Sequence, residues 1–184
     1  MQGRSHLLIG VSAYAALALR SVAGFGAPTL GGVPPEWSLP LSAAVVAVGS
    51  LLPDVDQRQA LLSRQVPVRA VSEVVSRVMH HRGPTHSLLA LLLVGALGGG
   101  LGAAWGLSGL STLLIWGYAL HLAADMATRS GVPLIWPLPG RFGLLPVRIV
   151  TDSLAERLLV GLVVLASAAH ALWPYVSASL ERVS

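Results

Sequence analysis

Cysteine and lysine are absent from this sequence, and acidic residues are scarce. Without cysteine there is neither a disulfide framework nor a thiolate metal site, so any bound metal ion must rely on imidazole and carboxylate ligands. Those ligands suit zinc, manganese or iron. The formal charge of +4 comes entirely from arginines, which flank apolar segments and form no basic run with interleaved aromatics. The charge pattern therefore argues against nucleic-acid binding.

The composition is that of a membrane protein. Only 11% of the residues are charged and 54% are hydrophobic, which is far from an ordinary soluble domain. A spanning helix needs about 20 largely apolar residues. Five segments are candidates: Leu7–Ala23, Leu39–Leu52, Ser87–Trp105, Leu107–Ala127 and Leu154–Trp173. We therefore predict one all-α domain, residues 1–184, built as a bundle of about five transmembrane or re-entrant helices.

Two of these segments have alternative interpretations. The first could be a secretory signal with Arg4 as its basic region, but no convincing small-residue cleavage site follows it, so we expect a retained helix. The second is short for a full span because Pro40 and Pro53 bracket it, and it could re-enter the membrane. Between Asp54 and Pro84, valines recur near helical spacing opposite polar residues, which predicts an amphipathic helix on the membrane surface.

Glycine and proline predict how the remaining segments are arranged. The third segment contains five glycines, which allow a neighbouring helix to approach closely. Only Gly106–Gly109 separates it from the fourth, so these two should form an antiparallel hairpin. The stretch from Arg129 to Val150 holds four prolines and no clear period, so we expect a loop, one that could fold over a site.

Arginine also predicts the orientation of the bundle. If all five segments span, ten arginines fall on one side and only Arg20 and Arg182 on the other. The arginine-rich side is then cytoplasmic by the positive-inside rule. Aromatic residues favoured at interfaces fall on the opposite side: Trp37, Trp105, Trp173 and Tyr175.

Histidines and acids gather at the arginine-rich ends of these segments. The sharpest pair is His121 and Asp125, because residues four apart on a helix share one face and can hold the same ion. Ionisable groups within a membrane helix are costly and usually functional. The alternative is a buried hydrogen bond between the two that serves only packing.

A second motif is His80-His81-Arg82-Gly83-Pro84-Thr85-His86-Ser87. Gly83 and Pro84 break the helix, so His81 and His86 can converge from either side of a turn. Ser87 or Thr85 can cap the following helix. Arg82 could neutralise phosphate oxygens; alternatively, the motif is a basic surface loop that touches lipid headgroups. Of the two adjacent imidazoles, we interpret His80 as the one that does not take part.

A third motif is Leu52-Pro53-Asp54-Val55-Asp56. Its two carboxylates could ligate metal or act as general base for water, or they could simply form the solvated end of a helix. His6 alone is a weak signal, since a single histidine near a helix start is often a cap. His170 lies at the far end of the fifth segment, and we interpret it as structural.

These motifs, with Ser5-His6-Leu-Leu-Ile-Gly10, Gly131-Val-Pro-Leu-Ile-Trp136-Pro137 and Glu156, resemble the YdjM-like family of inner-membrane, metal-dependent hydrolases. The resemblance covers nearly the whole chain and extends distantly to zinc-dependent phospholipases C and single-strand-specific nucleases. It implies metal ligands at six positions: His6, Asp54, His81, His86, His121 and Asp125. We predict catalytic roles for Asp54, Asp56, Arg82 and Glu156.

The resulting hypothesis is a membrane-bound hydrolase of a phosphate ester, in a phospholipid or lipid-linked substrate, at the cytoplasmic face of the inner membrane. We expect divalent ions, zinc first with manganese or iron as alternatives, and two of them because the ligands outnumber those that one ion needs. One rival is a metal or proton transporter that uses the same residues. A second is a scaffold whose helices are clamped by metal.

Overall fold

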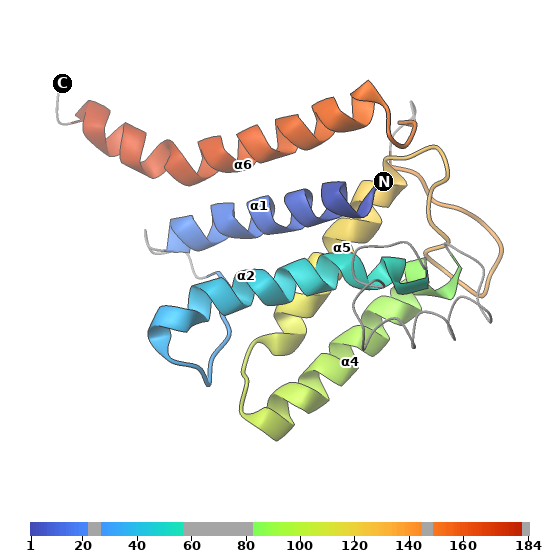
Figure 1. Cartoon of the computed structure of the whole chain (residues 1–184), viewed down its shortest axis with the longest axis horizontal. Coiled ribbons are helices and arrows are strands. Elements are labelled where there is room, and N and C mark those ends of the chain that lie inside the picture. The colour runs from blue at the N-terminus through green and yellow to red at the C-terminus, as the bar shows by residue number, and fades with distance from the viewer. Residues whose placement is uncertain (22–26, 57–82, 145–148, 182–184) are drawn as a thin grey trace.

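The computed structural model describes residues 1–21, 27–56, 83–144 and 149–181 (Figure 1). Within these ranges the chain is helical and contains no strand, only two isolated β-bridges. Its elements are α1 (Gly3–Ser21), α2 (Pro35–Leu51), η1 (Leu52–Asp56), η3 (Pro84–His86), α4 (Leu88–Trp105), α5 (Leu110–Met126) and α6 (Leu154–Glu181). This confirms the predicted all-α class. His81, Arg82 and most of the predicted amphipathic helix lie outside the described residues.

The second helix is longer than predicted. It begins at Pro35, and Pro40 lies inside it instead of marking its start. Pro40 has no N–H to donate to the preceding turn, but near the start of a helix this removes only one hydrogen bond. The η1 turn continues α2 to Asp56, so Pro35–Asp56 forms a segment of 22 residues. That length removes the reason for expecting a re-entrant helix.

Three helical segments are long and apolar enough to cross a membrane: Pro35–Asp56, Leu88–Trp105 and Leu154–Leu180. Among the described helices, α1 and α5 are not in this set, so the prediction that they too span or re-enter the membrane stays a prediction. α6 also runs past the predicted end at Trp173 to Glu181, with Pro174 inside it.

Helix α5 lies at the centre of the packing, in contact with α1, α2 and α4, while α6 packs along α1 (Figure 1). An apolar core joins α1, α2 and α5 through residues such as Tyr14, Val46 and Leu113. A second cluster, with Ile9, Ala124 and others, ties α1 and α5 to α6 near the start of α6.

Glycine allows α2 and α5 to cross closely. A Cβ atom on Gly117 would lie 2.3 Å from the carbonyl oxygen of Val46 and 2.8 Å from the amide nitrogen of Ser50. On the other side of the crossing, a Cβ on Gly49 would lie 2.6 Å from the carbonyl oxygen of Leu114. Neither position has room for a side chain. The crossing therefore brings the end of α2 against α5 one turn before His121.

Helices α4 and α5 form the predicted antiparallel hairpin (Figure 1). Gly95, Gly98 and Gly102 of α4 are buried, as the prediction of a close helix contact requires. Ser111 of α5 donates a hydrogen bond of 2.7 Å to the carbonyl of Gly95. Ser87 is the predicted N-cap of α4, since its hydroxyl accepts from the amide of Ala90 at 3.2 Å.

The segment between α5 and α6 is a loop in its described part, as predicted. Thr128 pairs with Ile149 and Val132 pairs with Phe142 in the isolated bridges. The amide of Leu88, at the start of α4, donates to the carbonyl of Leu134 at 2.9 Å. These bonds hold the loop at the same end of the bundle as η1, η3 and the first residues of the chain (Figure 1).

Candidate metal centre

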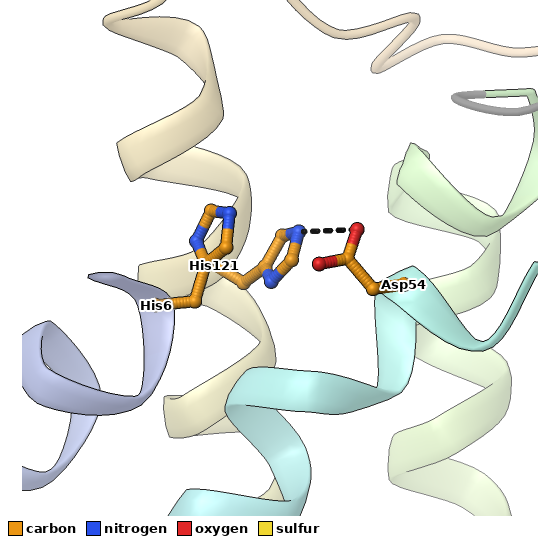
Figure 2. Close-up of side chains that lie close together, drawn as sticks. All are labelled: His6, Asp54 and His121. Carbon is orange, nitrogen blue, oxygen red and sulfur yellow. Dashed lines mark ion pairs between the residues drawn. The ribbon is translucent and has the colours of Figure 1, made fainter. Parts of the chain in front are cut away.

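Five buried side chains meet at this end of the bundle. They are His6 of α1, Asp54 of η1, His86 of η3, and His121 and Asp125 of α5, and none is more than 3% exposed. Figure 2 shows three of them, from three separate elements, with the ring of His121 between His6 and the carboxylate of Asp54. Two triads that could hold a metal ion share His121: His6–Asp54–His121 and His86–His121–Asp125.

Four donor atoms in this cluster face one another. The Nε2 atoms of His86 and His121 are 3.3 Å apart. Asp54 Oδ1 lies 3.7 Å from the His86 Nε2 and 3.8 Å from the His121 Nε2. Asp125 Oδ2 lies 3.5 Å and 3.9 Å from the same two atoms. The two imidazoles and the two carboxylates thus enclose one small space.

These separations fit a single divalent ion. Zinc binds histidine nitrogen and carboxylate oxygen at about 2.0–2.2 Å, usually with tetrahedral geometry. In such a shell, neighbouring donors are about 3.3–3.6 Å apart, by geometry from those bond lengths. The donor separations around His86 and His121, from 3.3 to 3.9 Å, are close to that range. Asp54, His86, His121 and Asp125 therefore have the chemistry and the spacing of a metal site.

The hydrogen bond on the far side of His121 fixes which ring nitrogen faces the cluster as an acceptor. His121 Nδ1 lies 2.7 Å from the carbonyl oxygen of Ser50. A carbonyl oxygen can only accept, so Nδ1 carries the hydrogen and Nε2 keeps its lone pair. Metal-binding histidines typically have such a partner on their other nitrogen.

Hydrogen bonds through Thr85 to Asp56 fix the tautomer of His86 in the same way. The Thr85 hydroxyl donates to Asp56 Oδ2 at 3.1 Å and lies 3.1 Å from His86 Nδ1. Its single hydrogen is used on Asp56, so Thr85 accepts from His86 Nδ1, and the neutral form of His86 then has its lone pair on Nε2. With these tautomers, the lone pairs of His86 and His121 face each other across 3.3 Å in a buried site. A cation between them removes the repulsion.

His6 is the third imidazole and has a different environment. Its ring stacks on that of His121, with centroids 3.5 Å apart and planes 15° apart. Neither ring nitrogen of His6 has a hydrogen-bond partner among the described residues. Its Nε2 lies 3.4 Å from Asp125 Oδ1, the oxygen that the amino group of Met1 also contacts. A buried imidazole without a hydrogen bond is costly, so a ligand at His6 would lower the free energy of the site.

The predicted catalytic carboxylates differ in how closely they approach the cluster. Asp54 is in the cluster, whereas Asp56 reaches it through Thr85. Glu156 accepts hydrogen bonds from the amide of Gln2 at 3.1 Å, the hydroxyl of Ser5 at 2.6 Å and the amide of Asp152 at 2.8 Å. Glu156 therefore ties the first turn of α6 to the start of α1, which carries His6. Its predicted catalytic role stays a prediction.

Two other predicted positions can be placed in part. His170, interpreted as structural, lies on α6 at the end away from the cluster, with its Nδ1 3.5 Å from Arg20. His81 and Arg82 lie outside the described residues.

Sequence reasoning missed several groups that orient the cluster. The Ser50 carbonyl has no sequence signal, because any residue could supply a backbone oxygen. Thr85 stands next to His86 in the motif and was considered only as a helix cap. The Tyr118 hydroxyl donates to the Thr85 carbonyl. Tyr118 lies three residues before His121, on the same side of α5, a spacing that could have indicated it.

The fold and this cluster together define a helical membrane protein with a buried His/Asp centre at one end of its helices. The chain belongs to the YdjM inner membrane protein family, whose pattern it matches over residues 1–180.

Individual relatives agree with this assignment. The chain is 38% identical over 100 residues to the inner membrane protein YdjM of Escherichia coli (strain K12), a match that covers 51% of this chain and 48% of the relative. The YdjM protein of Shigella flexneri gives the same values. The uncharacterized protein YvsG of Bacillus subtilis (strain 168) is 36% identical over 127 residues, 69% of this chain and 76% of the relative.

This chain thus aligns with about half the length of the two YdjM relatives. No solved structure matches it. The distant similarity to zinc-dependent phospholipases C and nucleases is not shown by these comparisons and stays a hypothesis.

Proposed function

We propose that this protein is a metal-dependent hydrolase that cleaves a phosphate ester in a phospholipid or another lipid-linked substrate, at the cytoplasmic boundary of the inner membrane. The observation that carries the proposal is the cluster of Asp54, His86, His121 and Asp125, in which the donor atoms around the two imidazoles lie 3.3 to 3.9 Å apart. The cluster lies where one candidate span ends, at Asp56, and another begins, at Leu88. A substrate anchored in the bilayer carries its phosphate at that depth.

The donor set suits zinc, with manganese or iron as alternatives. A divalent ion in such a site supplies Lewis-acid polarisation of a phosphoryl oxygen and activates water for attack. Asp54, His86, His121 and Asp125 would hold this ion. A second ion would be held by His6 together with the other oxygen of Asp125, which could bridge the two positions.

The protein's own residues would have three further tasks in the reaction. The oxygen of a water molecule forms a new bond to phosphorus while the ester P–O bond breaks, and the leaving alcohol takes up a proton. Asp54 or Asp56 would orient that water and accept its proton. Arg82 would neutralise the phosphate oxygens. Glu156 would keep the start of α1, and with it His6, in position.

The position of the cluster favours hydrolysis over transport. Binding sites of transporters usually lie near the bilayer midplane on broken helices, whereas this cluster is at helix ends. The scaffold alternative requires a closed shell of ligands. The unpartnered nitrogens of His6 indicate a site with binding capacity beyond the four facing donors.

The test uses the full chain purified in detergent. It is assayed against a panel of lipid phosphates and phosphodiesters, with and without chelator and with zinc or manganese restored. His121→Ala should abolish phosphate release, and the same substitution at His170, on the far end of α6, should leave it unchanged. Lack of chelator-sensitive release on the whole panel, from protein that contains metal, would contradict the hydrolase proposal. Metal-dependent uptake by proteoliposomes in its place would support the transporter.

A further inference from the structure

The loop between α5 and α6 presents an apolar surface that no helix accounts for. Its exposed side chains include Ile135 (50% exposed), Trp136 (39%), Leu138 (63%), Phe142 (41%) and Leu144 (61%). Apolar residues exposed on a membrane helix face lipid as a matter of course. On a loop they need another explanation, because a loop in water is normally polar.

The backbone of this loop is suited to an apolar environment. Between residues 133 and 144 three residues are prolines, which have no N–H group to leave unpaired: Pro133, Pro137 and Pro139. The amide of Trp136 donates to the carbonyl of Pro133 at 3.0 Å, and that of Leu138 to the carbonyl of Ile135 at 2.9 Å. Val132 and Phe142 exchange both of their hydrogen bonds, at 3.0 and 2.8 Å. Backbone that is paired internally can enter the membrane boundary at low cost.

Charge and position indicate what this surface contacts. From residue 128 to residue 151 the sequence contains three arginines and no acidic residue. Arg141 is exposed, and its guanidinium donates to the Ser130 carbonyl at 3.1 Å. The loop is held at the end of the bundle where Pro35–Asp56 ends and where Leu88–Trp105 and Leu154–Leu180 begin. Apolar side chains flanked by arginine at that depth match the boundary between acyl chains and anionic headgroups.

We propose that residues 133–144 insert into the anionic leaflet and form a lipid-contacting rim beside the metal centre. Trp136 then lies at the interface, where tryptophan is favoured. The lipid contact itself stands independently of the proposed hydrolysis. Its consequence rests on that function: the substrate reaches the cluster from the bilayer and not from the aqueous phase.

The absence of cysteine makes a direct test simple, because one introduced cysteine is the only thiol. A nitroxide is attached to Leu138→Cys in proteoliposomes of phosphatidylethanolamine and phosphatidylglycerol. The matched control is Thr151→Cys, an exposed polar position in the turn before α6. Collision of each label with oxygen, which concentrates in lipid, is compared with collision with a water-soluble nickel chelate.

We expect the label at position 138 to collide with oxygen and be shielded from nickel, and the label at position 151 to show the reverse. Nickel accessibility at position 138 as high as that of a label in water would overturn the proposal, because it places the loop in the aqueous phase. Shielding from both reagents at 138 would also overturn it and would indicate a protein partner, such as a second copy. Ile135→Cys repeats the measurement should Leu138→Cys fail to fold. Because no step measures hydrolysis, this result is independent of the proposed function.

Discussion

The Nε2 atoms of His86 and His121 lie 3.3 Å apart in a site closed to solvent, and each ring is held in place by a hydrogen bond on its opposite nitrogen. The carbonyl of Ser50 holds His121, and the Thr85 hydroxyl holds His86. The orientation of the two imidazoles is therefore built into the fold before any ion binds. The groups that hydrogen-bond the ligand histidines should thus affect metal affinity almost as strongly as the ligands themselves.

Thr85 offers the cleanest test of this arrangement. Thr85→Val removes the hydroxyl that joins His86 to Asp56 while keeping the shape of the side chain. We expect metal affinity to fall by about 10- to 100-fold, as for other groups that orient ligands. Thr85→Ser keeps the hydroxyl and should retain affinity near that of the wild type. Isothermal titration of metal-free protein with zinc measures both variants, and equal affinities would show that Thr85 does not orient His86.

The crossing of α2 and α5 gives a prediction about stability. In Gly117→Ala the new methyl group would contact the Val46 carbonyl and the Ser50 amide, and overpacking of this kind costs about 1–3 kcal/mol. Since Ser50 holds His121, the variant should also bind metal more weakly. Gly99→Ala on α4 is the matched control, because a Cβ there has nothing within 4 Å. Thermal unfolding in detergent, with and without zinc, compares the two variants. Equal unfolding temperatures for Gly117→Ala and Gly99→Ala would show that the close crossing of α2 and α5 does not depend on glycine at position 117.

Much of the helical framework follows from the sequence, because apolar length alone locates helices in a membrane protein. Four predicted segments reappear as α1, α4, α5 and α6 with shifted ends. The start of α2 was wrong, since Pro40 was treated as a boundary although the helix begins at Pro35, the first helical position, where a proline costs little.

The gathering of His6, Asp54, His86, His121 and Asp125 was predicted from the helix ends on which they lie. The contacts that each of these side chains makes were harder to predict. That His6 would stack on His121, or that Ser50 would hold His121, depends on how α1 and α2 cross α5. Every residue has a backbone carbonyl, and no residue type by itself specifies how two helices cross. The sequence alone therefore could not show these contacts.

Variants of Glu156 test whether this residue positions the start of α1 or takes part in catalysis. Its carboxylate accepts from Gln2, Ser5 and Asp152, so Glu156→Ala should loosen the start of α1. We expect a loss of about 0.5–1.5 kcal/mol of stability for each hydrogen bond removed, and weaker metal binding. Glu156→Gln keeps one acceptor oxygen and should lie between the wild type and Glu156→Ala. Unchanged stability and metal content with lost hydrolysis would assign Glu156 to the chemistry instead.

Orientation in the membrane is tested by labelling in intact cells. With ten arginines predicted on the side of the metal centre and two on the other, a single cysteine at the exposed Thr151, in the turn before α6, should be shielded from an impermeant thiol reagent. One beside Trp37, in the first turn of α2, should react. Both should react after the membrane is permeabilised. The reverse pattern before permeabilisation would place the metal centre outside the cytoplasm.

The number of bound ions is the last prediction, and the structure indicates how to count them. Asp54, His86, His121 and Asp125 supply the donors that one ion needs. His6 and the second oxygen of Asp125 lie 3.4 Å apart on the other side of that carboxylate, so Asp125 could bridge two ions about 3.5–4 Å apart, a spacing common in phosphate-ester hydrolases. We therefore expect two ions per chain in protein purified without chelator.

The matched variants for this count are His6→Ala and His121→Ala. The first should release the ion at His6 and keep the other, whereas the second removes a ligand of the four-donor site and should release the ion held there. Elemental analysis gives the ratio of metal to protein for each, and anomalous scattering from crystals locates the ions. One fully occupied peak in the wild type, with an unchanged ratio in His6→Ala, would leave a single ion at the four facing donors and limit His6 to stacking on His121.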